Sequence, residues 1–221
     1  MLEIDRDHGA RGALRRLGAG AAHGLARLAL HGVDWVGARP TVHGRPFVEN
    51  LGRIWIGDDL TLSSSPVRSH LVTGPRGLLR IGHAVSIGAG AAIAAEERVE
   101  IGDGAHLDAF VMLLDSDYHG ADDRAAPGAG APFVIGAHAW IGERVTVLQG
   151  TIIGAHARIE SGSVVSGVIP DGAVVAGVPA RVVRSHHERA ATHDLLACVQ
   201  RIAAEVFALP ALPAPTRGPK D

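Results

Sequence analysis

The chain has 221 residues, 29 of them glycine, and only 4% of its residues are aromatic. Its formal net charge is −2, so it lacks the strong basic field with which proteins hold nucleic acid or anionic membranes, and we expect neither as a partner. The single cysteine, Cys198, excludes an internal disulfide and a cysteine-based metal cluster, which favours a reducing, cytoplasmic location.

Residues 1–39 are expected to form an N-terminal helical segment. The stretch is rich in alanine and leucine, but arginines interrupt it, so it reads neither as a membrane span nor as a signal peptide. Its apolar side chains fall close to one helix face at Leu14, Leu17, Ala21, Leu25 and Leu28. We expect this face to pack on the body of the protein or on a second subunit, with a helix on a membrane surface as the alternative.

A six-residue repeat organises the middle of the chain. Aliphatic residues recur every six positions from Ile135 to Val165, and the same frame runs from Ile81 to Val99 and, after a slip of two residues, from Ile101 to Leu113. Glycine often follows the lead aliphatic, where we expect it to permit a positive φ at a corner. A period of six fits neither an amphipathic helix nor an alternating strand and predicts a triangular solenoid with the lead aliphatic pointing inward.

The predicted fold class is therefore an all-β solenoid, a left-handed parallel β-helix of hexapeptide repeats with an N-terminal helix and a C-terminal amphipathic helix. The competing right-handed α/β architecture needs long helices between the strands, which the sequence lacks. We place the β-helix at residues 40–184, with degenerate coils before residue 80. Residues 185–209 carry apolar side chains at helical spacing, and 210–221 are expected to be a disordered tail.

The repeat breaks between Leu113 and Ile135, which lie 22 residues apart and so are out of step with a period of six. Six positions beyond Leu113 stands His119, an imidazole in a slot that the frame reserves for an aliphatic side chain. We interpret residues 119–133 as a loop excursion, with His119 at the point where the chain leaves the coil.

These ordered motifs resemble the hexapeptide-repeat acyltransferases of the galactoside, maltose and antibiotic O-acetyltransferase type. The resemblance covers roughly residues 80–184: His119 before a looped-out segment, then "AWIG" at 139–142, then "ESGSVVSGVIPDGAVVAGVPARVVR" at 160–184 with its closing "AGVPARVVR". It implies transfer of an acetyl group from acetyl-CoA to a hydroxyl, or an amine, of a sugar-like or other small acceptor. It further implies direct attack with His119 as general base, no metal, and a homotrimer with its sites at the subunit seams.

The chemistry of the residues agrees with that implication. A free imidazole has a pKa of about 6.5 and is available as a base near neutral pH, and a positioned general base contributes roughly 10² to 10⁴ in rate. Asp115 and Asp117 flank His119 and are candidates for contacting the acceptor, with Glu96 as a further acidic candidate. Trp140 matches the tryptophan that walls the acceptor pocket in the family.

The donor side is inferred from the last coils. The resemblance places pantetheine against backbone at Gly142, Ser161 and Ser166, and basic residues matching Arg181 and Arg184 near the nucleotide phosphates, which suit guanidinium groups. Two departures stand out. Ser166-Gly167 replaces the Thr-Lys of many relatives, and Gly88 stands where sugar acetyltransferases place an acceptor-binding asparagine.

Two other functions compete with acyl transfer. One is a zinc enzyme on the same fold, like the γ-class carbonic anhydrases, for which His138 and His156, one coil apart, are the candidate ligands. The other is a non-catalytic scaffold. A scaffold has no need of the combination of His119, Trp140 and the terminal motif, and turnover of acyl-CoA separates the two.

Overall fold

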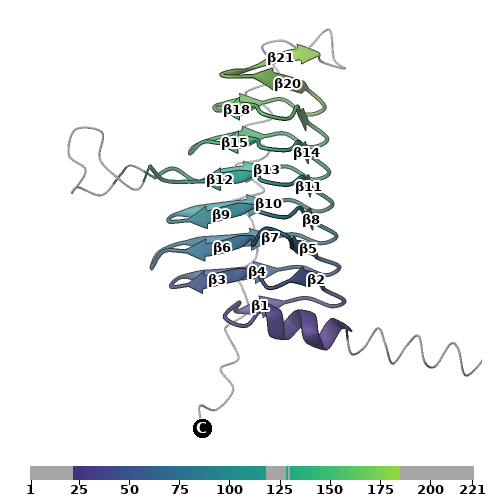
Figure 1. Cartoon of the computed structure of the whole chain (residues 1–221). Coiled ribbons are helices and arrows are strands. Elements are labelled where there is room, and N and C mark those ends of the chain that lie inside the picture. The colour runs from purple at the N-terminus through teal and green to yellow at the C-terminus, as the bar shows by residue number, and fades with distance from the viewer. Residues whose placement is uncertain (1–21, 118–127, 129, 185–221) are drawn as a thin grey trace, which may run out of the picture.

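Short strands separated by turns build the molecule, and three consecutive strands complete one coil of a parallel β-helix (Figure 1). The computed structural model describes residues 22–117, 128 and 130–184. The coils stack along one axis, and strands of successive coils pair in parallel. The left-handed β-helix expected from the sequence is confirmed.

Three sheets form the sides of the prism. Sheet A contains β1 (Trp35–Val36), β4 (Arg53–Ile56), β7 (Leu78–Ile81), β10 (Arg98–Ile101), β13 (Phe133–Ile135), β16 (Ile152–Ile153) and β19 (Val168–Ile169). Sheet B contains β2 (Thr41–Gly44), β5 (Thr61–Ser64), β8 (Ser86–Ile87), β11 (His106–Leu107), β14 (Trp140–Ile141), β17 (Arg158–Ile159), β20 (Val174–Gly177) and β21 (Ala180–Arg184). Sheet C contains β3 (Phe47–Asn50), β6 (His70–Thr73), β9 (Ala92–Ala95), β12 (Met112–Leu114), β15 (Thr146–Val147) and β18 (Val164–Val165).

The core is the column of inward side chains that the repeat predicts. Lead aliphatics from successive coils of sheet B, Leu107, Ile141 and Ile159, align in register and are buried. Small residues at the fifth position, such as Ala105 and Ala139, are also buried, because they fill the narrow space beside the corners. The corners are named here by the sheets that they join: A/B, B/C and C/A.

The N-terminal end differs from expectation. A helix spans residues 22–29, and β1 begins at Trp35, earlier than the expected boundary at residue 40. Leu25 and Leu28 are about two-thirds exposed, whereas Ala26 and Leu30 are buried and Leu30 joins the core. Over the described residues, Leu25 and Leu28 therefore do not pack on the body of their own chain, and Leu30, beyond the helix, makes that contact; packing of the helix face on a second subunit stays a prediction. No helix in the described ranges is long and apolar enough to cross a membrane.

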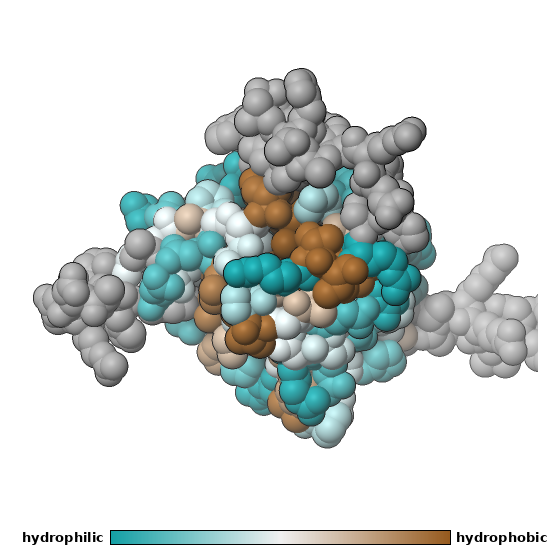
Figure 2. Space-filling model, turned by 90° about the horizontal axis from the view of Figure 1, so that it is seen from above, coloured by the Kyte–Doolittle hydropathy of each residue, from teal (hydrophilic) through white to brown (hydrophobic). Residues whose placement is uncertain are grey.

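The terminal motif forms the opposite end of the prism. β21 turns back and pairs antiparallel with β20, so it closes sheet B instead of starting another coil. The end-on view shows apolar side chains near the middle of this end (Figure 2), and Val182 and Val183 are exposed there. The predicted helix at 185–209, the tail at 210–221 and most of the loop at 119–133 lie outside the described residues.

The glycines after the lead aliphatics have a different role from the one expected. Gly88, Gly136 and Gly142 do not have a positive φ; the left-handed residues stand two positions later, at Gly90, His138 and Arg144. What requires glycine is the next coil. A Cβ on Gly136 would lie 2.5 Å from the backbone nitrogen of Ala155 and 2.7 Å from the carbonyl carbon of Gly154. Neither backbone atom can move without opening the coil stack.

We therefore expect Gly136→Ala to destabilise the protein by about 1 to 3 kcal/mol, the usual range for overpacking. Thermal unfolding followed by circular dichroism measures the shift in Tm. Gly24→Ala is the matched control for added side-chain volume, because a Cβ there meets open space and Gly24 does not have a positive φ. A loss for Gly24→Ala as large as that for Gly136→Ala would contradict the steric explanation.

Candidate active site

The predicted site residues occupy two regions of the prism. Asp117, Glu96 and Ser166 lie at the C/A corner, where the loop leaves the coil after β12 and where β9 and β18 end. Trp140 lies on the outward side of sheet B, in β14. In a three-sided prism the C/A corner is opposite sheet B, so within one chain the whole core lies between these groups. His119 is two residues beyond Asp117 and lies outside the described residues.

Asp115 is a structural residue and not an acceptor contact. Its side chain is fully buried, and its Oδ1 accepts the backbone N–H of Glu96 at 2.7 Å. Its Oδ2 accepts the N–H groups of Glu97 at 2.8 Å and Arg98 at 2.7 Å. The expectation that Asp115 binds the acceptor is corrected for this reason: its carboxylate fixes the turn between β9 and β10, directly beneath the start of the loop.

Asp117 and Glu96 remain accessible at the same corner. The Oδ2 of Asp117 accepts a hydrogen bond of 2.6 Å from the Nε2 of Gln149, which follows β15 in the next coil. The carboxylate of Glu96 lies over Gly74, where any side chain would overlap it, and its residue is partly exposed. Both acidic groups therefore stand beside the root of the loop that carries His119.

Trp140 is the centre of an ordered cluster on sheet B. Its side chain is partly exposed, its Nε1 donates to the Oδ2 of Asp108 at 3.0 Å, and its ring meets the ring of His106 at a centroid distance of 4.8 Å. On the side of the next coil, the guanidinium of Arg158 lies 5.1 Å from the centroid of the Trp140 ring. The Nε of Arg158 in turn donates to Glu160 at 3.1 Å. Cation–π and ring contacts from two coils hold the indole in place.

Four residues of this cluster were not predicted from the sequence: His106, Asp108, Arg158 and Glu160. His106 and Asp108 stand two apart on β11 and the turn that follows it, and both point outward from sheet B. The available signal was this spacing alone. His106 and Asp108 contact Trp140 because β11 pairs with β14. That pairing cannot be read from the six-residue period, because the loop between the two strands has a length that is out of step with it.

The predicted donor residues lie at two corners and on the last strand of sheet B. Gly142 and Ser161 occupy successive turns at the B/C corner, where the Oγ of Ser161 accepts the N–H of Glu143 at 3.1 Å. Arg181 and Arg184 lie on β21, the last strand of sheet B, and are exposed. Ser166 stands apart at the C/A corner. Four of the five donor residues therefore follow sheet B and its edge from Trp140 towards the end of the prism.

The candidate zinc ligands do stack. The rings of His138 and His156 lie nearly parallel with centroids 5.1 Å apart, both exposed at the A/B corner. Among the described residues no group of three or more histidine, cysteine or acidic side chains is arranged to hold a metal ion. A separate open groove of about 570 Å³ runs along the outward side of sheet A, past Trp55, Arg80 and Glu100, and none of the predicted site residues lines it.

Comparisons with known proteins agree with this picture. The family model described as "Bacterial transferase hexapeptide (six repeats)" matches residues 134–167. An Escherichia coli protein named "Putative lipopolysaccharide biosynthesis O-acetyl transferase WbbJ" is 33% identical over 153 residues, which cover 64% of this chain and 76% of the relative. A Mycobacterium tuberculosis protein named as a "Probable acetyltransferase" is 34% identical over 162 residues, covering 70% of this chain and 50% of the relative.

Solved structures share the fold. The N-acyltransferase AntD from Bacillus cereus, in complex with dTDP and coenzyme A, superposes with a TM-score of 0.62 at 18% identity, covering 82% of this chain and 95% of that one. A galactoside acetyltransferase in complex with coenzyme A superposes with a TM-score of 0.50 at 23% identity, covering 74% and 70% of the two chains.

The coil stack, its terminal hairpin and these matches define an acyltransferase built on a β-helix. The chain belongs to the hexapeptide-repeat acyltransferase family, as the sequence predicted.

Proposed function

We propose that this protein transfers an acetyl group from acetyl-CoA to a hydroxyl of a carbohydrate-like acceptor, with His119 as general base. The observation that carries the proposal is the sequence of groups along sheet B: Trp140, then Gly142 and Ser161 at its edge, then the two arginines of β21. When the pantetheine arm of CoA follows this edge in an extended conformation, the phosphates of its nucleotide part lie near Arg181 and Arg184. The two relatives named as acetyltransferases give further support.

The proposed reaction needs one base and one stabilised oxyanion. His119 takes the proton of the acceptor hydroxyl as its oxygen attacks the thioester carbonyl carbon of acetyl-CoA. The tetrahedral oxyanion then collapses, the carbon–sulfur bond breaks, and the CoA sulfur receives the proton from the imidazolium. No acyl-enzyme forms, and the reaction as written needs neither a metal nor an oxidant. Backbone N–H groups at the turns are the candidate donors to the oxyanion.

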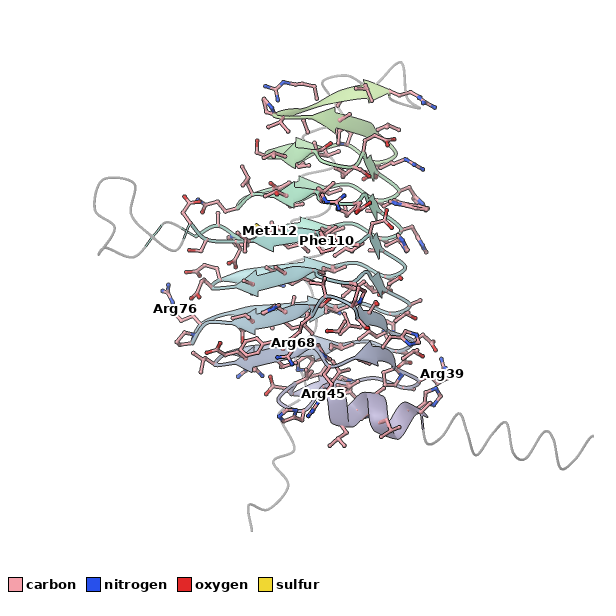
Figure 3. All side chains as sticks on the ribbon, viewed as in Figure 1. Arg39, Arg45, Arg68, Arg76, Phe110 and Met112 are labelled. Carbon is pink, nitrogen blue, oxygen red and sulfur yellow. The ribbon has the colours of Figure 1, made fainter. Side chains whose placement is uncertain are left out.

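The proposed site requires two copies of the chain. The root of the His119 loop is at the C/A corner, and Trp140 is on the opposite sheet, so the loop of one copy must approach sheet B of another. We therefore propose a homotrimer, the closed ring that repeats this contact three times. Exposed apolar side chains support such a contact: Val67 and Phe110 at the B/C corner and Met112 on sheet C are about 40% exposed, and Figure 3 shows Phe110 and Met112 higher along the prism than Arg68.

Product analysis tests the proposal directly. The purified full chain is incubated with acetyl-CoA and a panel of methyl hexopyranosides, hexosamines and simple alcohols, and thiol release is paired with mass spectrometry of the acceptor. We expect a mass gain of one acetyl group on a hydroxyl and a particle of three times the 22.9 kDa chain mass by light scattering. Acetylation of amines alone would reassign the enzyme to N-acyl transfer, and no acetylated product with any acceptor would favour the scaffold.

A further inference from the structure

The cluster around Trp140 includes a second imidazole that the proposed reaction does not use. We propose that His106, held by Asp108, is an acceptor-binding residue that recognises a hydroxyl of a sugar ring next to the one that is acetylated. This inference rests on the proposed function, because it assigns residues to the acceptor side of the same site.

His106 and Asp108 both have hydrogen-bonding positions that the cluster does not use. The Nε2 of His106 lies 3.0 Å from the Oδ1 of Asp108. A carboxylate only accepts, so Nε2 is the donor of this bond, and in the tautomer that satisfies it Nδ1 is an acceptor. Nδ1 has no partner among the described residues. The Asp108 carboxylate receives one bond from His106 and one from Trp140, which leaves about two of its four lone-pair positions open.

These positions are exposed and held in a fixed orientation. The side chains of His106 and Asp108 are 40% and 34% exposed, so their unused acceptors reach solvent. The ring contact with Trp140 and the bond from its Nε1 fix both groups in one geometry. Binding a ligand here therefore costs little side-chain entropy, which is the usual advantage of a preorganised site.

The neighbouring coil presents only small side chains beside the pair. Ser86 of β8 is in register with His106, and Gly88, two residues further on, packs against the backbone of Asp108 and carries no side chain that could cover the pair. The outward column of sheet B before His106 consists of Thr41, Thr61 and Ser86, all with small side chains. A ring-shaped ligand can lie over Ser86 and Gly88 with one edge against His106 and Asp108.

The chemistry of the ligand follows from these groups. The unused acceptors lie on opposite sides of the bond between His106 and Asp108, so they accept from two separate O–H donors. A hexopyranose presents several donors around its ring, whereas a simple alcohol presents one donor. A hydrogen bond to the uncharged Nδ1 contributes about 0.5 to 1.5 kcal/mol, and one to the Asp108 carboxylate about 1.5 to 3 kcal/mol. Replacing His106 removes the first and also frees the carboxylate from the group that positions it, which corresponds to about tenfold or more weaker acceptor binding.

The test separates acceptor binding from catalysis. His106→Phe keeps the ring contact with Trp140 but removes both nitrogens. With the methyl hexopyranoside that the unchanged enzyme acetylates best, we expect KM for the acceptor to rise at least tenfold, with kcat and the KM for acetyl-CoA within about threefold. Asp108→Asn should raise the acceptor KM by less, because an amide oxygen still accepts from Trp140. His156→Asn, at the remote A/B corner, keeps a residue that tolerates the positive φ and should change nothing.

Singly deoxygenated methyl hexopyranosides complete a double-mutant cycle. Removing the recognised hydroxyl should weaken binding to the unchanged enzyme about tenfold or more and leave binding to His106→Phe nearly unaffected. The inference is overturned if the acceptor KM is unchanged in His106→Phe, if no deoxygenation is coupled to it, or if only non-carbohydrate alcohols are acetylated. His119→Ala tests the proposed base separately, because it should lower turnover without changing the coupling between His106 and the recognised hydroxyl.

Discussion

His119→Ala is expected to lower kcat/KM for acetyl transfer by about 10² to 10⁴ while leaving the Tm within a few degrees. The imidazole supplies the proton acceptor without which the hydroxyl is a poor nucleophile. The coils on either side of the loop carry the core: Leu113 and Phe133 are fully buried at its two ends. Thiol release under saturating acetyl-CoA measures the loss, and circular dichroism measures the fold.

The control for this variant is His138→Asn, which removes an exposed imidazole from the A/B corner, away from sheet B and the loop. It should retain full turnover. Equal CoA release by the unchanged enzyme and by His119→Ala with every acceptor would show that His119 is not the base.

Asp115→Ala is expected to be among the most destabilising single substitutions in the chain, at about 3 kcal/mol or more. Truncation removes a buried carboxylate that accepts three backbone N–H groups and leaves those donors without their partner at the C/A corner. Denaturant unfolding gives the free energy. Because the corner lies beneath the root of the loop, turnover should fall as well, in proportion to the folded fraction.

Asp103→Ala provides the matched comparison. Asp103 is exposed, and its Oδ1 accepts one backbone N–H, from His83 at 2.7 Å. We expect a loss of about 1 kcal/mol there, the usual contribution of one such bond. If both aspartates cost the same, or if Asp115→Ala unfolds like the unchanged protein and loses only acceptor affinity, the structural assignment of Asp115 would be wrong.

The solenoid was predictable because its determinants are local. A buried aliphatic every six residues and a small residue at the fifth position can be read directly from the sequence. Each coil requires the same residue types at the same positions. The segment that forms the hairpin of β20 and β21 was predicted only as a terminal sequence motif, because its residue pattern does not indicate that β21 runs antiparallel to β20. At the N-terminal helix, Leu30, which lies outside the helix, makes the contact with the core of its own chain, whereas Leu25 and Leu28 are exposed.

The candidate site was harder to predict from the sequence, because it depends on contacts between coils. Asp115 looked like an acceptor contact since it stands four residues before His119, but its burial is fixed by backbone donors 17 to 19 residues away. The pair of His106 and Asp108 joins Trp140 only through a register that an irregular insertion interrupts. The glycines that follow the lead aliphatics were identified, but their steric reason lies in the backbone of the next coil.

Subunit complementation tests the two-copy site most directly. His119→Ala and Trp140→Ala chains, carrying different affinity tags, are coexpressed, and mixed oligomers are isolated by both tags in succession. Each mixed trimer then has one seam at which an intact His119 faces an intact Trp140, so about a third of the activity of the unchanged enzyme should return. Turnover no higher than that of the two parent variants, in mixed oligomers shown to be intact, would contradict a site shared between copies.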